Sequence, residues 1–249
     1  MSIDYRKQPK APAAAVGLEQ ITDSAPGLVS LYKTAAVSLA KRRISGERAA
    51  VYLVLDRSGS MRPYYRDGSV QHLAEQTLAL AAHLDDDGVV PVIFFSTGID
   101  GTADISLDAY QDRINPLHES MGHMGRTNYH VAMQAVIDHY ESSGATAPAL
   151  VVFQTDGSPS SRTAAEHVLC TAARLPIFWQ FIGFGHDDFR FLRKLDDLPV
   201  PGRRVIDNAG FFAAGPSPRD MGDVDLYDQL LQEFPHWLTA ARNAGIVRN

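Results

Sequence analysis

The strongest constraint on the fold of this chain is its alternation of apolar runs with helical patterns. Four runs carry almost no polar side chain, so none shows the period-two pattern of a strand with one solvated face. They are residues 49–56, 89–96, 148–156 and 176–185. Strands of this kind are covered on both faces, and helical segments between them make their pairing mostly parallel. The sequence therefore predicts a three-layer, doubly wound α/β domain, with helices on both faces of a mostly parallel sheet.

Helical periodicity fills the connections between these runs. The segments with apolar residues at helical spacing are 70–84, 128–141, 161–174 and 224–245. Pro235 interrupts the last segment and is expected to kink that helix or divide it in two. Residues 102–110 carry a weaker strand signal, and we expect them to pair with the run at 89–96 as an edge hairpin.

The N-terminal part is predicted to contribute one helix outside this alternation. Residues 1–26 mix Pro, Ala, Lys and Ser without periodicity and are interpreted as a mobile leader. Helical spacing starts at Leu28 and continues to Leu39, and Gly46 ends it. Residues 27–249 are therefore expected to form a single domain with an N-terminal helical extension.

Composition limits the classes of function. With 45% hydrophobic and 21% charged residues, the chain has the balance of a soluble globular protein. A formal net charge of -6 argues against nucleic-acid binding, which usually requires a basic face. No signal peptide or membrane span is evident, and the single cysteine, Cys170, agrees with a reducing compartment. We therefore expect a cytoplasmic protein without nucleic-acid or membrane partners, and the sequence leaves its oligomeric state undefined.

Oxygen-bearing side chains gather where two of the predicted strands end. The first apolar run ends in Asp56, and Ser58 and Ser60 follow at every second position. The third run ends in Asp156, and a Gly-containing loop presents Thr127 just before a helix. Because the carboxyl ends of parallel strands share one edge of a sheet, we expect these five side chains to converge there.

The predicted ligand set consists of oxygen atoms only. It suits a hard divalent cation, Mg²⁺ or Mn²⁺ before Ca²⁺, and offers no soft ligand to zinc. Its three hydroxyls are neutral, so much of the ion's positive charge stays uncompensated. A carboxylate from a protein partner is then able to complete the coordination shell. The joint pattern is more specific than a lone Asp-x-Ser-x-Ser, which often only caps a helix or forms a turn.

DRSGS at 56–60, Thr127 in its loop and TDG at 155–157 together resemble the metal-ion-dependent adhesion site of von Willebrand factor A domains. The similarity extends from residue 47 to about residue 242. It implies that the three hydroxyls contact the metal directly or nearly so, and that the two carboxylates often act through water. It also implies that an Asp or Glu of a bound protein takes the sixth position. In some members the C-terminal helix shifts on binding, which makes residues 224–242 a candidate switch element.

A narrower resemblance is to the A domains of bacterial tellurium-resistance proteins. It rests on KRRISGERAAVYLVLDRSGSM, LDDDG, GRTNY, NAGFF and LLQEFPHWL. It implies a role in a bacterial tellurium-resistance or stress-response system. Arg126 departs from the pattern, because that group more often has a second glycine there. A large cation beside the ion would repel it unless the side chain points outward.

Two alternatives to a protein-binding module stay open at this point. A metal-dependent phosphohydrolase would polarise a phosphoryl oxygen with the ion, and it would need a general base such as His123 or His130. A scaffold domain would use the metal only to hold the strand-end loops. The sequence carries neither a G-x-S-x-G nucleophile elbow nor a P-loop, so we expect no enzyme.

Overall fold

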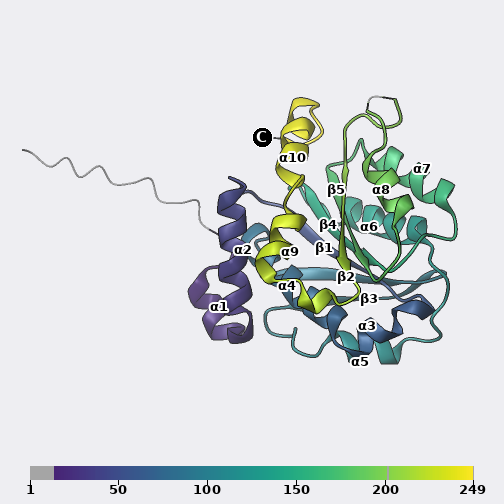
Figure 1. The fold of residues 1–249 in the computed structure, drawn as a ribbon. Coiled ribbons are helices and arrows are strands. Elements are labelled where there is room, and N and C mark those ends of the chain that lie inside the picture. Colours follow the sequence, from purple (N-terminus) through teal and green to yellow (C-terminus); the bar gives the residue numbers. More distant parts are fainter. Residues whose placement is uncertain (1–13, 201, 249) are drawn as a thin grey trace, which may run out of the picture.

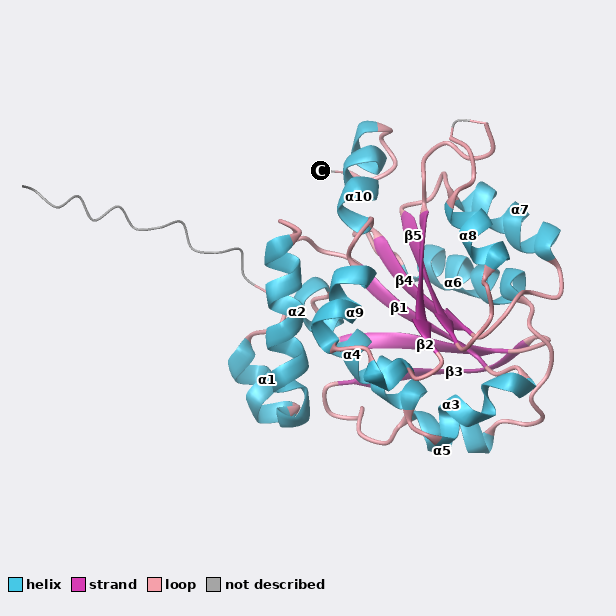
Figure 2. Ribbon diagram, in the orientation of Figure 1, coloured by secondary structure: helices cyan, strands magenta, loops and turns pink. Residues whose placement is uncertain are grey.

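The computed structural model describes residues 14–200 and 202–248 of the chain, and its centre is a six-stranded sheet (Figures 1 and 2). The strands are β1 Ala50–Asp56, β2 Val89–Phe95, β3 Ile99–Ser106, β4 Ala149–Thr155, β5 Ile177–Phe184 and β6 Ala209–Gly215. Their spatial order is β3-β2-β1-β4-β5-β6, and only the β2–β3 pair is antiparallel among these described strands. The predicted doubly wound, mostly parallel α/β fold is confirmed.

Helices cover both faces of this sheet (Figure 2). They are α1 Leu18–Ser24, α2 Val29–Lys41, α3 Arg62–Arg66, α4 Ser69–Leu84, α5 Ile114–Ser120, α6 Tyr129–Ser143, α7 Arg162–Ala172, α8 Arg190–Asp196, α9 Asp223–Leu230 and α10 Phe234–Asn243. Short 3₁₀ turns lie at Pro26–Leu28, Gly59–Met61 and Pro218–Asp220. Within the described ranges, no helix combines the length and the apolar character needed to cross a membrane.

The central strand β1 divides the core into two layers. Val51, Leu53 and Leu55 pack in one cluster with α2, α4, α9 and α10. Tyr52 and Val54 face the other way and pack in a second cluster with α6, α7 and α8. Because successive side chains of a strand point to opposite faces, both sets must be apolar when both faces are covered. This explains the continuously apolar run, and it fixes the direction in which β1 delivers Asp56 to the sheet edge.

The two edge strands, β3 and β6, differ in the strength of their strand signal in the sequence. β3 pairs with β2 as the predicted hairpin, and it begins at Ile99 rather than at residue 102. β6 carries no strand signal, because AGFFAAG contains two Gly and three Ala, which have low β-propensity. It forms because β5 offers a full parallel edge, with pairs such as Phe181 with Phe211.

The C-terminal apolar stripe forms two helices rather than one. α9 ends at Leu230 and α10 begins at Phe234, with Pro235 in its first turn. Proline is tolerated there because the first turn of a helix leaves its N–H groups unpaired. The prediction that Pro235 kinks or divides this segment is confirmed.

The interpretation of residues 1–26 as a mobile leader is wrong for its described part. Residues 1–13 lie outside the described residues, but Leu18–Ser24 form α1 and bury Ile21 completely. The chain just before α1 is hydrogen-bonded to α4, because the Val16 N–H donates to the Ala82 carbonyl at 2.8 Å. About two turns of helix with a single buried side chain give too little periodicity to be detected in the sequence.

Candidate metal centre

The candidate site lies at the edge of the sheet where β1 and β4 end. These strands are parallel neighbours, with Leu55 beside Gln154, so the residues that follow them emerge together. Asp56 is the last residue of β1, and Asp156 follows directly after β4. The topology therefore brings the two predicted carboxylates to the same edge, as the strand order requires.

Asp56 is fully buried and is held at both carboxylate oxygens. Its Oδ1 accepts a hydrogen bond from the Ser58 N–H at 2.6 Å, and its Oδ2 accepts one from the Thr155 hydroxyl at 2.7 Å. Burial is the main cause that raises the pKa of Asp56 to about 7, and the Asp156 charge adds to it. A bound cation would compensate this buried negative charge.

Ser58, Ser60 and Asp156 contact one another beside Asp56. The Ser58 and Ser60 hydroxyl oxygens are 3.2 Å apart, and the Ser58 hydroxyl donates to Asp156 Oδ1 at 3.4 Å. Ser60 also hydrogen-bonds to Asp156, and burial raises the pKa of that carboxyl. Two hydroxyls and one carboxylate thus share a small polar cluster next to a second, buried carboxylate.

The Thr127 loop reaches this edge through its backbone. The Thr127 carbonyl accepts a hydrogen bond from the Ser160 N–H at 2.7 Å, which joins it to the loop that follows Asp156. The Asn128 N–H donates to the Ser96 carbonyl at 2.9 Å, which joins it to the end of β2. Among the described residues, no hydrogen bond links the Thr127 hydroxyl to the other four predicted ligands.

Arg126 does not present the obstacle that its charge suggests. Its side chain is exposed, and its backbone N–H donates to the Thr97 hydroxyl at 2.9 Å. Gly125 before it must be glycine, because a Cβ there would lie 2.4 Å from Thr97 Oγ1 and 2.8 Å from Ser96 Oγ. The absence of a side chain at Gly125 therefore allows this loop to lie close to the turn between β2 and β3.

Arg57 supports the site from inside the protein and was not identified from the sequence. Its side chain is 2% exposed, and its Nη1 pairs with Asp100 Oδ2 at 2.7 Å. Its Nε donates to His118 Nδ1 at 3.0 Å, and its Nη2 donates to the His118 and Gly122 carbonyls at 3.2 Å and 3.1 Å. Arg57 thus fastens the strand-end turn to the β3 and α5 segments. Its position inside the Asp-x-Ser-x-Ser motif is the only sequence signal for it.

Tyrosines complete the support below Asp56. The Tyr65 hydroxyl donates to the Asp56 carbonyl at 3.0 Å, and the His118 ring stacks on Tyr65 with centroids 3.9 Å apart. Tyr129 is fully buried, and its hydroxyl donates to Thr155 Oγ1 at 3.2 Å and to the Gly157 carbonyl. These contacts fix the backbone on which the candidate ligands stand.

The donor chemistry of this cluster fits a hard divalent ion. Within the described ranges, no three His, Cys, Asp or Glu side chains gather as a metal cluster. The candidate centre depends on hydroxyls in addition to its two carboxylates, as Mg²⁺ and Mn²⁺ sites can. His118, one of the histidines near this region, is engaged by Arg57.

Comparison with known proteins defines the class of this chain. The family model vWA-TerF-like, described as the vWA found in the TerF C terminus, matches residues 48–247. The chain therefore belongs to this family of von Willebrand factor A domains.

One relative and two solved structures illustrate these similarities. The uncharacterized protein YcbR of Bacillus subtilis is 36% identical over 220 residues, which cover 87% of this chain and 88% of YcbR. The crystal structure of manganese-loaded Plasmodium vivax TRAP protein has a TM-score of 0.52 at 21% identity, covering 76% of this chain and 74% of that one. Proximal thread matrix protein 1 from the mussel byssus, with a zinc-occupied MIDAS motif, has a TM-score of 0.48 at 16% identity, covering 78% of this chain and 48% of that one.

Proposed function

We propose that this protein is a metal-dependent protein-binding module. A divalent cation, Mg²⁺ or Mn²⁺ before Ca²⁺, is held by the side chains predicted from the sequence, and an Asp or Glu of a protein partner completes its shell. The proposed ligands are Asp56, Ser58, Ser60, Thr127 and Asp156. The observation that carries this proposal is the contact of Ser58 with both Ser60 and Asp156, directly beside the buried Asp56 carboxylate.

The charge of the cluster supports an open coordination position. Two carboxylates balance the charge of one divalent ion only when both are ionised and close to it, and the hydroxyls add none. In the related adhesion sites the carboxylates often act through water, which leaves the ion electrophilic. An acidic side chain from outside is then the strongest available ligand, because a charge-assisted contact exceeds a neutral one.

The biological setting is proposed from the family and the relative. The matching family takes its name from the TerF C terminus, which supports a role in a bacterial tellurium-resistance or stress-response system. We place this role in the cytoplasm, since the lone Cys170 suits a reducing compartment. No nucleic-acid partner is proposed, because the chain carries a formal net charge of -6.

Partner capture from a bacterial lysate tests the proposal. The full chain serves as bait in Mg²⁺, in Mg²⁺ with excess chelator, and in chelator followed by Mn²⁺, and captured proteins are quantified by mass spectrometry. We expect a set of proteins that is lost in chelator and regained with Mn²⁺. Equal capture in all three conditions would contradict a metal bridge.

Metal binding is also expected to stabilise the fold. An ion bound only by the folded chain adds about 2.7 kcal/mol at a hundred times its dissociation constant. For a chain of this size this raises the melting temperature by about 5–10 °C. Thermal unfolding followed by circular dichroism in Mg²⁺ and in chelator measures the shift, and an Asp156→Asn variant is expected to lose most of it. A shift of the same size in that variant would place the stabilising ion elsewhere.

A further inference from the structure

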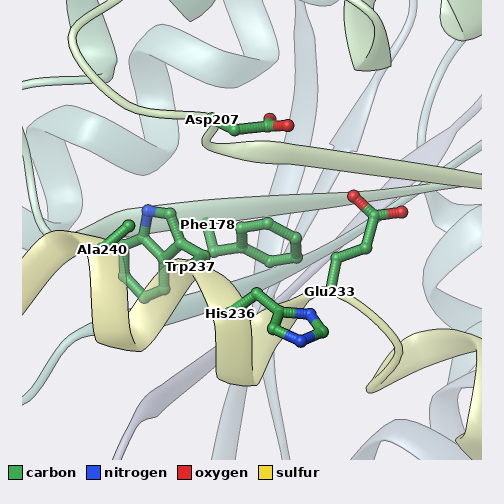
Figure 3. Close-up of a pocket in the computed structure, with 6 residues that line it drawn as sticks. All are labelled: Phe178, Asp207, Glu233, His236, Trp237 and Ala240. Carbon is green, nitrogen blue, oxygen red and sulfur yellow. The ribbon is translucent and has the colours of Figure 1, made fainter. Parts of the chain in front are cut away.

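A cavity lies at the opposite edge of the sheet from the candidate metal centre. It has a volume of about 320 Å³ and is lined by Phe178, Asp207, Glu233, His236, Trp237 and Ala240 (Figure 3). Phe178 is the second residue of β5, and Asp207 lies two residues before β6. The cavity, called the acidic pocket below, is therefore formed by α10 and the amino-terminal ends of two strands. It is independent of the residues proposed to hold the ion.

Two carboxylates and the His236 imidazole are the titratable groups in the otherwise mainly apolar lining of the acidic pocket. Figure 3 shows the carboxylates of Asp207 and Glu233 in its wall, and Asp196 lies next to them. Arg204 pairs with Asp207 at 2.8 Å, but its buried guanidinium also donates to the Leu198 and Asp196 carbonyls. The Glu233 carbonyl accepts a hydrogen bond from the Trp237 N–H at 3.0 Å, but the Glu233 carboxylate has no hydrogen bond or ion pair with any of the residues that the structure describes. Of the carboxylates of Asp196, Asp207 and Glu233, Arg204 pairs directly only with that of Asp207.

The closeness of these carboxylates predicts that Asp196→Asn raises the melting temperature by an amount that depends on pH. Burial is the main cause that raises the pKa of Asp196 from 3.8 to about 7. The negative charges of Glu233, Asp207 and Asp197 add to this rise, and the positive charge of Arg204 opposes it. An ionised Asp196 therefore destabilises the folded state most above pH 7, and the cost shrinks as the pH falls from 7 towards 3.8. We expect the variant to melt at a higher temperature than the wild type at pH 8, with a smaller gain at pH 5.5. The exposed Asp108→Asn serves as control, and equal gains at both pH values would contradict the assignment.

Two buried polar groups beside these carboxylates lack partners. Trp237 is 3% exposed and lines the pocket, and its Nε1–H has no acceptor among the described residues. Gln180 is 2% exposed, and its Oε1 has no donor there. A Cβ on Gly210 would lie 2.8 Å from Gln180 Oε1 and 3.3 Å from the Glu233 carboxyl, so both acceptors lie close to the Gly210 backbone. Buried groups of this kind are normally paired, and each unpaired one has a cost.

The wall of the pocket suits an organic cation better than a metal ion. No three acidic, His or Cys side chains lie close enough together to hold one metal ion in the part of the chain that the structure describes. Phe178 and Trp237 give the pocket an apolar side, with ring centroids 5.6 Å apart. An apolar stem that ends in a positive charge matches such a wall, because lysine and arginine bury their methylenes and keep their charged ends near polar groups.

We propose that the acidic pocket binds the side chain of a lysine or arginine in a polypeptide partner. The ammonium or guanidinium lies between Glu233 and Asp207, where it supplies the positive charge that Arg204 alone does not. The stem lies against Phe178 and Trp237. The domain then has two binding edges, one for an acidic partner residue and one for a basic one.

Indole signals offer a direct test of this proposal. The chain has two tryptophans, and Trp179 is fully buried in the core cluster on the other face. The ¹⁵N-labelled protein is titrated with N-acetyl-argininamide, with N-acetyl-lysinamide and with the neutral analogue N-acetyl-citrullinamide. We expect the cationic probes to move the Trp237 Nε1–H signal, assigned with Trp237→Phe, and to leave that of Trp179 in place. The citrulline probe is expected to move neither.

Variants decide whether the carboxylates carry the binding. Glu233→Gln is expected to weaken the affinity for the arginine probe by about tenfold or more, since a charged hydrogen bond is lost. Glu141→Gln removes the same charge from an exposed position on α6 and is expected to bind like the wild type. If Glu233→Gln does not fold, Asp207→Asn repeats the test. The Asp207 side chain is 55% exposed, so its replacement is less disruptive to the fold. The proposal is overturned if no cationic probe moves Trp237, if citrulline binds equally well, or if the folded carboxylate variants keep full affinity.

Discussion

Replacing Ser58 and Ser60 together by alanine is expected to lower the Mg²⁺ affinity by more than about a hundredfold. Changes around a metal's direct ligands already cost 10–100-fold in many sites, and here two direct oxygen ligands would be removed. Their hydroxyls are 3.2 Å apart, and Ser58 also contacts Asp156, so one ion is able to use both. Isothermal titration calorimetry with Mg²⁺ measures the loss, and capture of lysate partners is expected to disappear with it.

A matched double variant separates this effect from a general loss of serines. Ser142 and Ser143 lie exposed at the end of α6. Their hydroxyls donate to the His139 and Tyr140 carbonyls, and the Ser143 hydroxyl also accepts from the Ala145 N–H and hydrogen-bonds with the side chain of Tyr52. Their joint replacement by alanine is expected to leave Mg²⁺ affinity and capture unchanged. If the Ser58 and Ser60 variant bound Mg²⁺ as tightly as the wild type, the ion would not be held at this edge of the sheet.

Arg57→Met is expected to give the largest loss of stability of any single change discussed. It leaves the Asp100 carboxylate, whose side chain is 15% exposed, without its guanidinium partner at 2.7 Å. Removing one member of a buried ion pair costs about 3–5 kcal/mol, because the remaining charge stays desolvated. For a chain of this size, the melting temperature should fall by about 6–20 °C. Thermal unfolding in chelator measures this without a contribution from bound metal.

Two further variants identify the cause of that loss. Arg57→Lys keeps the charge but cannot make the four contacts of the guanidinium, so an intermediate stability is expected. Combining Arg57→Met with Asp100→Asn removes the unpaired charge and should recover part of the stability. A double variant less stable than Arg57→Met alone would show that the buried charge is not the origin of the cost.

Much of the fold was predictable because burial on both faces leaves a direct mark on the sequence. β1 is apolar from Ala50 to Leu55 and β4 from Ala149 to Phe153, and a strand with one solvated face does not produce this pattern. The division of the C-terminal segment followed from Pro235 alone. β6 and α1 were missed because their formation depends on tertiary contacts. β6 is ordered by pairing with β5, and α1 is held by one buried isoleucine and by backbone contacts to α4.

The candidate site was predictable in its residues but not in its support. Strand-end chemistry identifies Asp56 and Asp156, and the structure brings both beside Ser58 and Ser60. Metal binding by this set, with Thr127, stays a prediction. The support by Arg57 could not be found, because its partners lie about forty to sixty-five positions further along the chain. The acidic pocket joins residues from β5, the β6 approach and α10, and no local pattern predicts that meeting.

The count of water ligands on a bound Mn²⁺ tests the central claim most directly. Electron spin echo envelope modulation in D₂O reports how many water molecules coordinate the ion, with the protein alone and with a captured partner. If a partner carboxylate completes the shell, at least one water ligand will be lost when the partner binds, and the Asp-to-Asn or Glu-to-Gln change in the partner will restore it. An unchanged water count in the partner complex would contradict a metal-bridged interaction.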